Sequence, residues 1–371
     1  EPVLIQHVKI AGIDTAIRFH HILDTTGAML VTGLRRIACE HPDPVFKLTD
    51  IRLAVLLPVP IPEMKEKIKD VELLISEFED ITKEVIDAAE KLKIIVCCRN
   101  EAFASIDIEA ATAKGIPVLR AGGRNAIAVA EHTIALLMCV SKNMSLTDHL
   151  LKYTDQLTNV QYHDNGGKRA ETMSEWSMDP DAPFALYGGG PEMYGKTFGQ
   201  IGFGMIGREV AKRAHALGLI IYDPYVSQEQ MDYLDAKKVD LDTVMKEADF
   251  ISVNCNVVPE TVGLISREKI ALMKPTAYFV NTARAKVLDY DALYDALKEK
   301  KIAGAGLDVY PVEPIPAGDK ILSLRNVVLT PHLAGSARDI VGHQTEIVLT
   351  DVKKILAHEQ PKFICNPEVL K

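Results

Sequence analysis

Three polar side chains of different chemistry stand just after three apolar runs in the second half of the chain: Arg284, Glu313 and His332. Each run reads as a strand, and open parallel sheets bind their ligands beyond the carboxyl ends of the strands. We therefore expect a guanidinium, a carboxylate and an imidazole to converge at one edge of a sheet. Proline adjoins Glu313 and His332, and it stiffens both loops because its ring fixes the backbone.

This combination suits the interconversion of a 2-keto acid and a 2-hydroxy acid by hydride transfer. The planar fork of Arg284 can clamp the substrate carboxylate. His332 can give the forming alkoxide its proton, because imidazole titrates near neutrality. A carboxylate at Glu313 would orient the ring and favour its charged, proton-donating form. Taken alone, Arg284 could be a surface cation, Glu313 a solvated acid and His332 a residue at the entrance to a helix. Their joint placement favours catalysis.

A glycine motif earlier in the chain offers a cofactor site. A β-prone run leads into a G-x-G-x-x-G at residues 202–207, a helix-forming run follows, and a second apolar run ends at Asp223. Gly202 permits a tight turn, Gly204 lets a pyrophosphate approach the backbone at the helix N-terminus, and Gly207 lets helix and strand pack closely. Asp223 stands at the spacing of the acid that binds a ribose hydroxyl. A bare motif can be a surface turn, but this order of elements predicts dinucleotide binding.

Strands and helices alternate along the rest of the chain, which predicts the α/β class with parallel sheets covered on both faces. In the first unit, roughly residues 1–124, the expected strands are 3–8, 52–57, 71–76, 92–98 and 116–119, and the expected helices are 28–39, 63–70, 81–91 and 108–114. From Gly195 on, further strands are expected at 248–253, 278–281, 304–309 and 327–330, and helices at 290–300 and 338–358. A long apolar helix, 126–140, with Asn125 as its N-cap, connects the units, and His132 within it reads as a packing residue.

Residues 141–195 interrupt the alternation of strands and helices. They are polar, rich in Thr, Asp, Asn and Gly, and contain the single tryptophan, Trp176. An excursion of this length without clear periodicity is usually functional or interfacial. We interpret it as an arm that reaches a partner subunit, with a flexible loop as the alternative.

Composition excludes several classes of function. The chain has 371 residues, enough for two domains, and its net charge of −9 comes without a basic run, so nucleic acid and anionic membrane are poor candidate partners. No apolar run is long enough to span a membrane, and no signal peptide is visible. The six cysteines show neither a C-x-x-C nor a zinc spacing. We therefore expect reduced core cysteines, no metal site and a cytoplasmic location.

The sequence resembles the D-isomer-specific 2-hydroxyacid dehydrogenases over about residues 70–340. The motifs that carry the resemblance are Gly202-Phe203-Gly204-Met205-Ile206-Gly207, then Phe279-Val280-Asn281-Thr282-Ala283-Arg284, then the span from Gly306-Leu307-Asp308-Val309 through Glu313-Pro314 to Thr330-Pro331-His332-Leu333-Ala334-Gly335. The resemblance implies that Arg284, Glu313 and His332 are a catalytic trio that acts with NAD. It also implies homodimers, or dimer-based tetramers, formed through the segment before the glycine motif, which agrees with the arm.

The resemblance further implies a fold and a cofactor site. The fold is two doubly wound parallel-sheet domains: a flavodoxin-like substrate-binding domain, residues 1–124 and 333–371, and a Rossmann NAD-binding domain, residues 125–332, inserted into it. The implied cofactor-binding residues are Gly202, Gly204, Met205, Ile206, Gly207, Asp223, Cys255, Thr282, Ala283, Arg284, Asp308, His332 and Gly335.

The sequence also departs from the family pattern near the cofactor. Cys255, between Asn254 and Asn256, stands in a segment where the family usually has His-x-Pro. This difference alters the protein surface against which the adenosine of the cofactor would lie. Gln200 interrupts a strand that is normally apolar, and the strand before Asp223 looks short.

The substrate loop departs most from the family. It reads Arg99-Asn100-Glu101-Ala102-Phe103, where the family usually has a glycine-rich turn whose N–H groups hold the substrate carboxylate. Arg99 and Asn100 are therefore candidate substrate-binding residues. Arg99 could bind a phosphate or a second carboxylate, or it could pair with Glu101. The favoured substrate is a polar hydroxy acid, either a sugar acid or a phosphorylated hydroxy acid.

Two other functions fit the same motifs. The chain could be a nucleotide-sensing binding protein without turnover, or a phosphite-type dehydrogenase on the same scaffold. Formate dehydrogenases resemble the family but carry Gln at the position of Glu313, so a glutamate there disfavours that activity.

Overall fold

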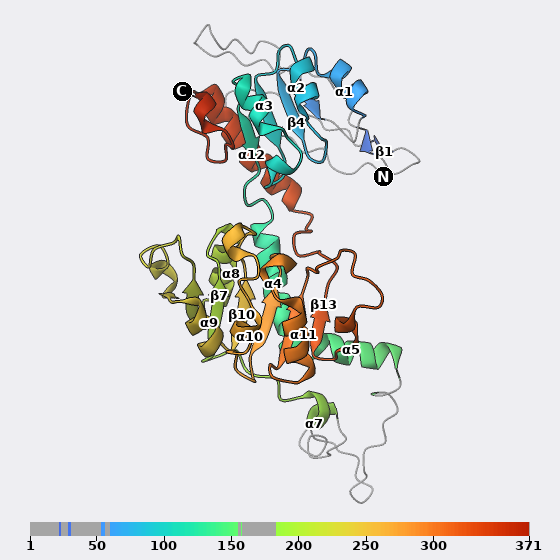
Figure 1. The fold of residues 1–371 in the computed structure, drawn as a ribbon, viewed down its shortest axis with the longest axis vertical. Coiled ribbons are helices and arrows are strands. Elements are labelled where there is room, and N and C mark those ends of the chain that lie inside the picture. Colours follow the sequence, from blue (N-terminus) through green and yellow to red (C-terminus); the bar gives the residue numbers. More distant parts are fainter. Residues whose placement is uncertain are drawn as a thin grey trace, which may run out of the picture. The chain divides into compact units, whose positions relative to one another are not determined.

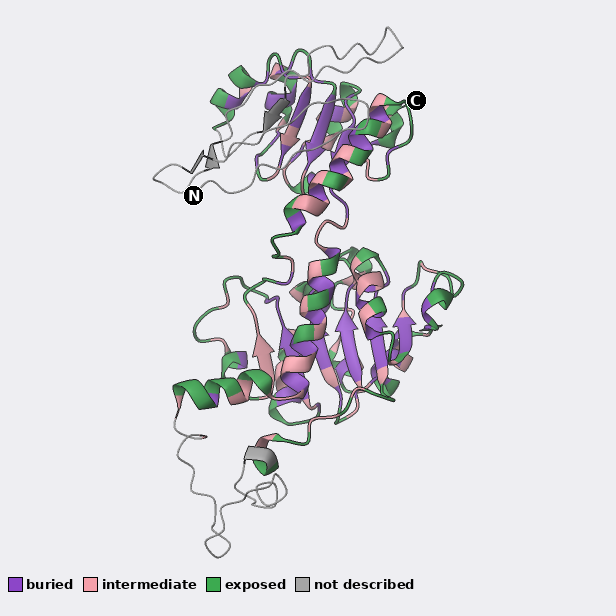
Figure 2. Cartoon of the chain, turned by 180° about the vertical axis from the view of Figure 1, so that it is seen from behind, coloured by how far each residue is buried: buried purple, intermediate pink, exposed green. Residues whose placement is uncertain are grey.

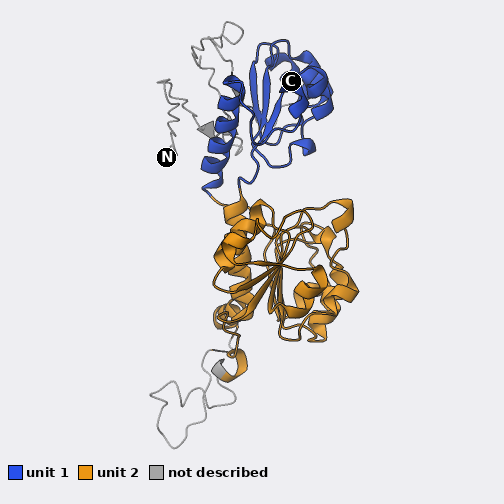
Figure 3. Cartoon of the chain, turned by 90° about the vertical axis from the view of Figure 1, so that its left-hand side faces the viewer, with its two compact units in different colours: residues 1–124, 338–371 blue, residues 125–337 orange. Residues whose placement is uncertain are grey.

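The structure is a computed structural model that describes residues 60–154, 157 and 183–370, and the backbone of three short strands nearer the N-terminus. The chain forms two compact units (Figure 3). Unit 1 comprises residues 1–124 and 338–371, and unit 2 comprises residues 125–337. The chain returns to unit 1 after Ala337, so the whole loop of His332 belongs to unit 2 and the return lies later than the expected boundary at residue 333.

Unit 2 is built on a seven-stranded parallel sheet in the order β13-β12-β11-β10-β7-β8-β9. The strands are β7 (Thr197–Ile201), β8 (Gly218–Tyr222), β9 (Lys237–Lys238), β10 (Phe250–Val253), β11 (Tyr278–Asn281), β12 (Gly304–Leu307) and β13 (Val327–Leu329). The strand order reverses between β7 and β10, which is the switch point where open α/β sheets bind their ligands. The predicted α/β class and the Rossmann arrangement are confirmed.

Helices cover both faces of this sheet (Figure 1). They are α4 (Ala126–Ser141), α8 (Met205–Ala214), α9 (Leu241–Glu247), α10 (Arg267–Ile270) and α11 (Tyr290–Lys298). One apolar core joins α4 and α8 to the sheet through residues such as Leu137, Val210 and Phe198, and a second core joins α9, α10 and α11 through residues such as Val244 and Leu293. The inner strands β10, β11 and β12 are therefore mostly buried, the edge strand β13 is half-buried, and much of the outward helix surface is exposed (Figure 2).

Unit 1 contains a four-stranded parallel sheet in the order β3-β4-β5-β6. The strands are β3 (Leu53–Val55), β4 (Leu73–Ser76), β5 (Ile94–Cys97) and β6 (Val118–Arg120), and the helices are α1 (Ile61–Lys67), α2 (Lys83–Ala88), α3 (Ile108–Ala113) and α12 (Ile340–Leu356). The C-terminal segment completes this unit, because the Asn366 side chain accepts from the N–H of Val118 at 2.8 Å and donates to the carbonyl of Ile116 at 2.9 Å.

Two local expectations were wrong. Helix was expected from residue 28, but β2 (Met29–Leu30) pairs antiparallel with β1 (Ile22–Leu23). The intervening sequence contains Asp and Gly, residue types that favour turns, and the apolar spacing alone misled the interpretation. The expected strand at 3–8 lies outside the described residues.

The second error concerns the start of α4. Asn125 is the N-cap residue, but its side chain makes no capping hydrogen bond. Its amide nitrogen instead lies 2.6 Å from the position that a Cβ on Gly335 would occupy. Gly335 therefore lets the chain pass close to the Asn125 side chain.

The arm segment is described only at its ends. Helix α5 (Met144–Tyr153) begins it and α7 (Pro183–Tyr187) lies near its close, and the residues between them lie largely outside the described part of the chain. Lys142 donates to the carbonyl of Pro191 at 2.5 Å and Asn143 donates to that of Tyr187 at 2.9 Å, so the arm starts and ends at one place. In the described ranges, no helix is both long and apolar enough to cross a membrane.

Candidate active site

The three strands that precede the catalytic candidates are neighbours in the sheet, and their carboxyl ends share one edge. His332 Nδ1 lies 2.6 Å from Glu313 Oε2, so the loops after β13 and β12 meet. Arg284 follows β11, is exposed, and donates from Nη1 to the carbonyl of Ala283 at 2.8 Å. The imidazole and the carboxylate therefore form a direct pair, with the guanidinium on the adjacent strand end.

The charge state of Glu313 reflects its neighbours. Burial by itself would raise the pKa of the Glu313 carboxyl, but hydrogen bonds from His332 and from the N–H of Tyr310 outweigh it, together with the charges of His332 and Arg284. The pKa of Glu313 therefore lies below its ordinary value. At neutral pH the side chain beside His332 is an anion.

The backbone of His332 is held in an unusual conformation. Its φ is +55°, in the left-handed region that non-glycine residues seldom adopt. Its N–H donates to the backbone carbonyl of Asp308 at 2.9 Å, and the next two N–H groups donate to the Asp308 carboxylate at 2.8 and 2.9 Å. Asp308, which the resemblance placed among the cofactor-binding residues, thus uses both carboxylate oxygens to bind the loop of His332.

The loop before Arg284 is braced in a similar way by a residue that the sequence marked only as a strand end. The Asn281 side chain accepts from the N–H of Ala283 at 2.9 Å and donates to the carbonyl of Arg284 at 3.1 Å. Thr282 Oγ1 lies 2.7 Å from Thr133 Oγ1 on α4, and both residues are buried. Asn281 is a polar residue at the end of an apolar strand, where it is buried. That contrast in the sequence is the signal that could have identified Asn281 as a residue that holds the loop.

The glycine motif follows β7 and has the geometry of a phosphate cradle. Gly202 has φ +96°, and a Cβ there would lie 2.7 Å from the backbone nitrogen of Cys255. A Cβ on Gly207 would lie 2.4 Å from the carbonyl oxygen of Gly202. Gly204 faces open space, with nothing within 4 Å of such a Cβ, and no side chain caps α8, whose first residues are Met205 and Ile206. An open approach to the uncapped N–H groups of a helix fits a cofactor diphosphate.

Two buried side chains hold this turn. Gln200 is fully buried, and its amide donates to the carbonyl of Gly202 at 2.8 Å, so the polar residue in the strand braces the motif. Asp223 accepts from the N–H of Phe203 at 2.7 Å. Strand β8 begins at Gly218 and pairs with β7 along its whole length. The strand is therefore as long as β7 and not short as expected, and Asp223, directly after it, lies next to the glycine turn.

Cys255 and Asn254 follow β10 on the other side of the switch point. The Asn254 side chain accepts from Ser252 Oγ at 3.0 Å, and burial raises the pKa of the Cys255 thiol to about 11. The thiol is therefore uncharged at neutral pH, and it presents a neutral surface beside the turn.

The substrate-loop candidates lie in unit 1, at the carboxyl end of β5. The Arg99 guanidinium carbon lies 5.1 Å from the centre of the Phe78 ring, a cation–π distance. Arg99 makes no ion pair with any described residue, Glu101 included. The Asn100 side-chain oxygen accepts from Arg120 at 2.7 Å and is thus already engaged.

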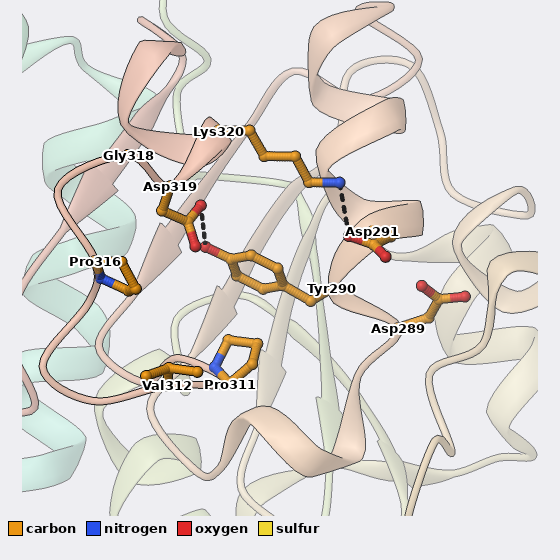
Figure 4. Close-up of a pocket in the computed structure, with 9 residues that line it drawn as sticks. All are labelled: Asp289, Tyr290, Asp291, Pro311, Val312, Pro316, Gly318, Asp319 and Lys320. Atoms are coloured by element: carbon orange, nitrogen blue, oxygen red, sulfur yellow. Dashed lines mark hydrogen bonds and ion pairs between the residues drawn. The ribbon is translucent and has the colours of Figure 1, made fainter.

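A cavity of about 490 Å³ is lined by the loop that carries Glu313 and by the start of α11, but not by Glu313 itself (Figure 4). Tyr290 donates to Asp319 at 3.2 Å, and Lys320 pairs with Asp291 at 2.6 Å. These contacts fasten the loop to α11. Within the part of the chain that the structure describes, no group of three or more His, Cys, Asp or Glu side chains could hold a metal ion.

Comparison with known sequences identifies the class of protein. Residues 168–334 match the NAD binding domain of the D-isomer specific 2-hydroxyacid dehydrogenases. The chain is 35% identical over 309 residues to the glyoxylate reductase of Korarchaeum cryptofilum, across 82% of this chain and 86% of that protein. The chain therefore belongs to the D-isomer specific 2-hydroxyacid dehydrogenase family, whose cofactor is NAD.

Other relatives differ in length and substrate. The D-3-phosphoglycerate dehydrogenase of Methanocaldococcus jannaschii is 38% identical over 308 residues, which are 82% of this chain and 53% of that protein, so the chain spans about half its length. The apo-structure of D-lactate dehydrogenase from Escherichia coli matches with a TM-score of 0.60 at 25% identity, across 83% of this chain and 90% of that chain. The predicted family and two-domain fold are confirmed.

Proposed function

We propose that this chain interconverts a 2-keto acid and a D-2-hydroxy acid. When bound, the nicotinamide cofactor supplies or accepts the hydride. The observation that carries the proposal is the 2.6 Å contact between His332 Nδ1 and Glu313 Oε2 at the ends of adjacent strands, in the same unit as the glycine turn.

The pair of His332 and Glu313 assigns a task to each nitrogen of the imidazole. Nδ1 is engaged by Glu313, so Nε2 is the nitrogen that can give a proton to the carbonyl oxygen of a keto acid and take it back in the reverse direction. Glu313 keeps the ring oriented and stabilises its charged form. Arg284 supplies the planar fork of donors that clamps the substrate carboxylate.

The activity is tested by following NADH oxidation with a panel of 2-keto acids, in wild type and in His332→Ala. We expect turnover by the wild type and a loss of roughly 10²–10⁴-fold in the variant, with NADH still bound by both. NADH binding without turnover of any keto acid would indicate a nucleotide-binding protein instead. NAD reduction by phosphite alone would indicate the phosphite-type activity.

We also propose that Arg99 selects substrates that carry a second anionic group. Support comes from its lack of an ion pair among the described residues and from the exposed Phe78 ring that holds it. The test compares oxaloacetate with pyruvate, and the phosphate ester of hydroxypyruvate with hydroxypyruvate. Arg99→Ala should lower kcat/KM for the doubly anionic member of each pair and spare the other. Equal losses within each pair would contradict this role.

A homodimer, or a tetramer of such dimers, is a further part of the proposal, formed through the arm. Helix α5 exposes Leu151 by 53% and Tyr153 by 74%, and such apolar side chains on one short helix suit an interface. Leu151→Asp should shift sedimentation from dimer to monomer, whereas Lys152→Ala on the same helix should not. A wild type that sediments as a monomer at micromolar concentration would exclude the dimer.

A cytoplasmic location is the last part of the proposal. The described cysteines, Cys97, Cys98, Cys139, Cys255 and Cys365, are all free thiols. Free thiols persist in reducing compartments. Fractionation of cells followed by detection of the protein would test the location.

A further inference from the structure

A hydrogen-bonded series of three side chains joins α4 to the loop of His332. His132 Nε2 lies 3.0 Å from Thr330 Oγ1, and Thr330 Oγ1 lies 2.5 Å from Asp308 Oδ1. Asp308 is fully buried, and its carboxylate accepts the two backbone N–H groups that follow His332. The series therefore begins on a helix distant in sequence and ends on the backbone of the candidate catalytic loop.

The number of hydrogens available fixes the direction of each bond. A threonine hydroxyl has one hydrogen, and an ionised carboxylate only accepts. Thr330 Oγ1 donates that hydrogen to Asp308, so it must accept a hydrogen from His132. Nε2 is therefore the nitrogen of His132 that bears the hydrogen, and it also lies 3.7 Å from the nearer Asp308 oxygen.

The loop that receives this support is strained. His332 has φ +55°, and a non-glycine residue remains in that region only when its surroundings hold it there. The Asp308 carboxylate supplies this hold, because it fastens the two following N–H groups. A donor that fixes Thr330 also fixes the orientation of the carboxylate.

We propose that His132 is a positioning residue for His332, acting through Thr330 and Asp308. This role rests on the proposed catalytic function of His332. In this role, the Nε2 hydrogen of His132 orients the Thr330 hydroxyl, and the hydroxyl donates to the Asp308 carboxylate and fixes its orientation. The carboxylate then holds the loop of His332. Because His132 would act through these two side chains, its removal should change the rate of the chemical step and leave cofactor binding unchanged.

The alternative is that His132 merely fills space between α4 and the sheet. Two substitutions separate the roles. His132→Leu fills much of the volume but has no hydrogen to donate, whereas His132→Gln places an amide N–H near the position of Nε2. His215→Leu is a matched control, because His215 lies in the same unit and, among the described residues, its ring bonds a backbone carbonyl, that of Leu234 at 3.2 Å, and no other side chain.

The expected result is a fall in kcat for His132→Leu of roughly tenfold, the effect of one lost hydrogen bond in a charged network. The Kd for NADH and the KM for the keto acid should stay at wild-type values. His132→Gln should recover most of kcat, and His215→Leu should behave as wild type. Equal losses in the Leu and Gln variants, or no loss in either, would overturn the positioning role.

Amide hydrogen exchange gives a second measurement that does not depend on turnover. The N–H groups of Leu333 and Ala334 should exchange faster in His132→Leu than in wild type, and at the wild-type rate in His132→Gln. If the wild type turns over no keto acid, the proposed function fails, and these exchange rates still decide whether His132 holds the loop. Unchanged exchange in the Leu variant would overturn the inference.

Discussion

Replacing Glu313 with glutamine probes the His332–Glu313 pair most directly, because it preserves shape and removes charge. The carboxylate oxygen lies 2.6 Å from His332 Nδ1, and at that separation Coulomb's law in a medium as polar as water gives about 1.6 kcal/mol. Both side chains are partly exposed, so a water-like medium is the appropriate choice.

The sign of the shift follows from which form of the imidazole the carboxylate favours. The anion stabilises the protonated ring, and keto-acid reduction needs that proton. In Glu313→Gln, the alkaline fall of the reductive rate should therefore move to lower pH. The pKa of Glu313 lies below its ordinary value, so its own titration adds nothing to the alkaline limb.

The assay is the initial rate of NADH oxidation at saturating keto acid and cofactor, from about pH 5 to 10, across the range where histidine titrates. Activity lost by the variant at high pH should return partly as the pH is lowered. Added salt should shrink the difference between variant and wild type, because it screens exposed charges.

A matched control is Asp319→Asn, in the same loop. Asp319 accepts a hydrogen bond from Tyr290 and not from His332. The alkaline limb of the pH profile of Asp319→Asn should therefore stay at the wild-type position. If Glu313→Gln loses activity but keeps the wild-type pH profile, Glu313 acts by holding the loop through the N–H of Tyr310. In that case the acid–base pair is wrong.

Three further predictions concern the cofactor and the substrate clamp. NADH should be preferred over NADPH because Asp223 repels a 2′-phosphate. Asp223→Ser should reduce this preference, measured as the ratio of kcat/KM for NADH to kcat/KM for NADPH. A wild type that uses NADPH as well as NADH would contradict the prediction. Gln200→Met should raise the Kd for NADH roughly fivefold, the effect of one neutral hydrogen bond, while Ser252→Ala leaves that Kd unchanged; equal values for both variants would show that the brace on Gly202 is dispensable. Arg284→Ala should raise KM for the keto acid and lower kcat, because the clamp orients the carbonyl, and unchanged kinetics would remove Arg284 from the site.

The sequence alone determined which strands and helices carry the site and at which edge of the sheet the site lies. A strand, a glycine turn, a helix and a second strand that ends at an acid are local patterns, and each depends on residues close together in the chain. The rule that parallel strands end on the same edge then brought Glu313 and His332 together without knowledge of any contact. The same local reasoning failed at Met29–Leu30, because a short apolar pair reads equally well as helix or strand.

The tertiary structure decided which side chains hold the site in place. His132 and Thr330 are 198 residues apart, and the contact exists because this face of α4 packs on the sheet beside β12 and β13. Apolar periodicity gives the side of a helix that is buried, but it does not say which buried polar atom will meet which partner. The hydrogen bonds of Asp308, Gln200 and His132 therefore follow only from packing, because the geometry of each is set by the assembled sheet and helices.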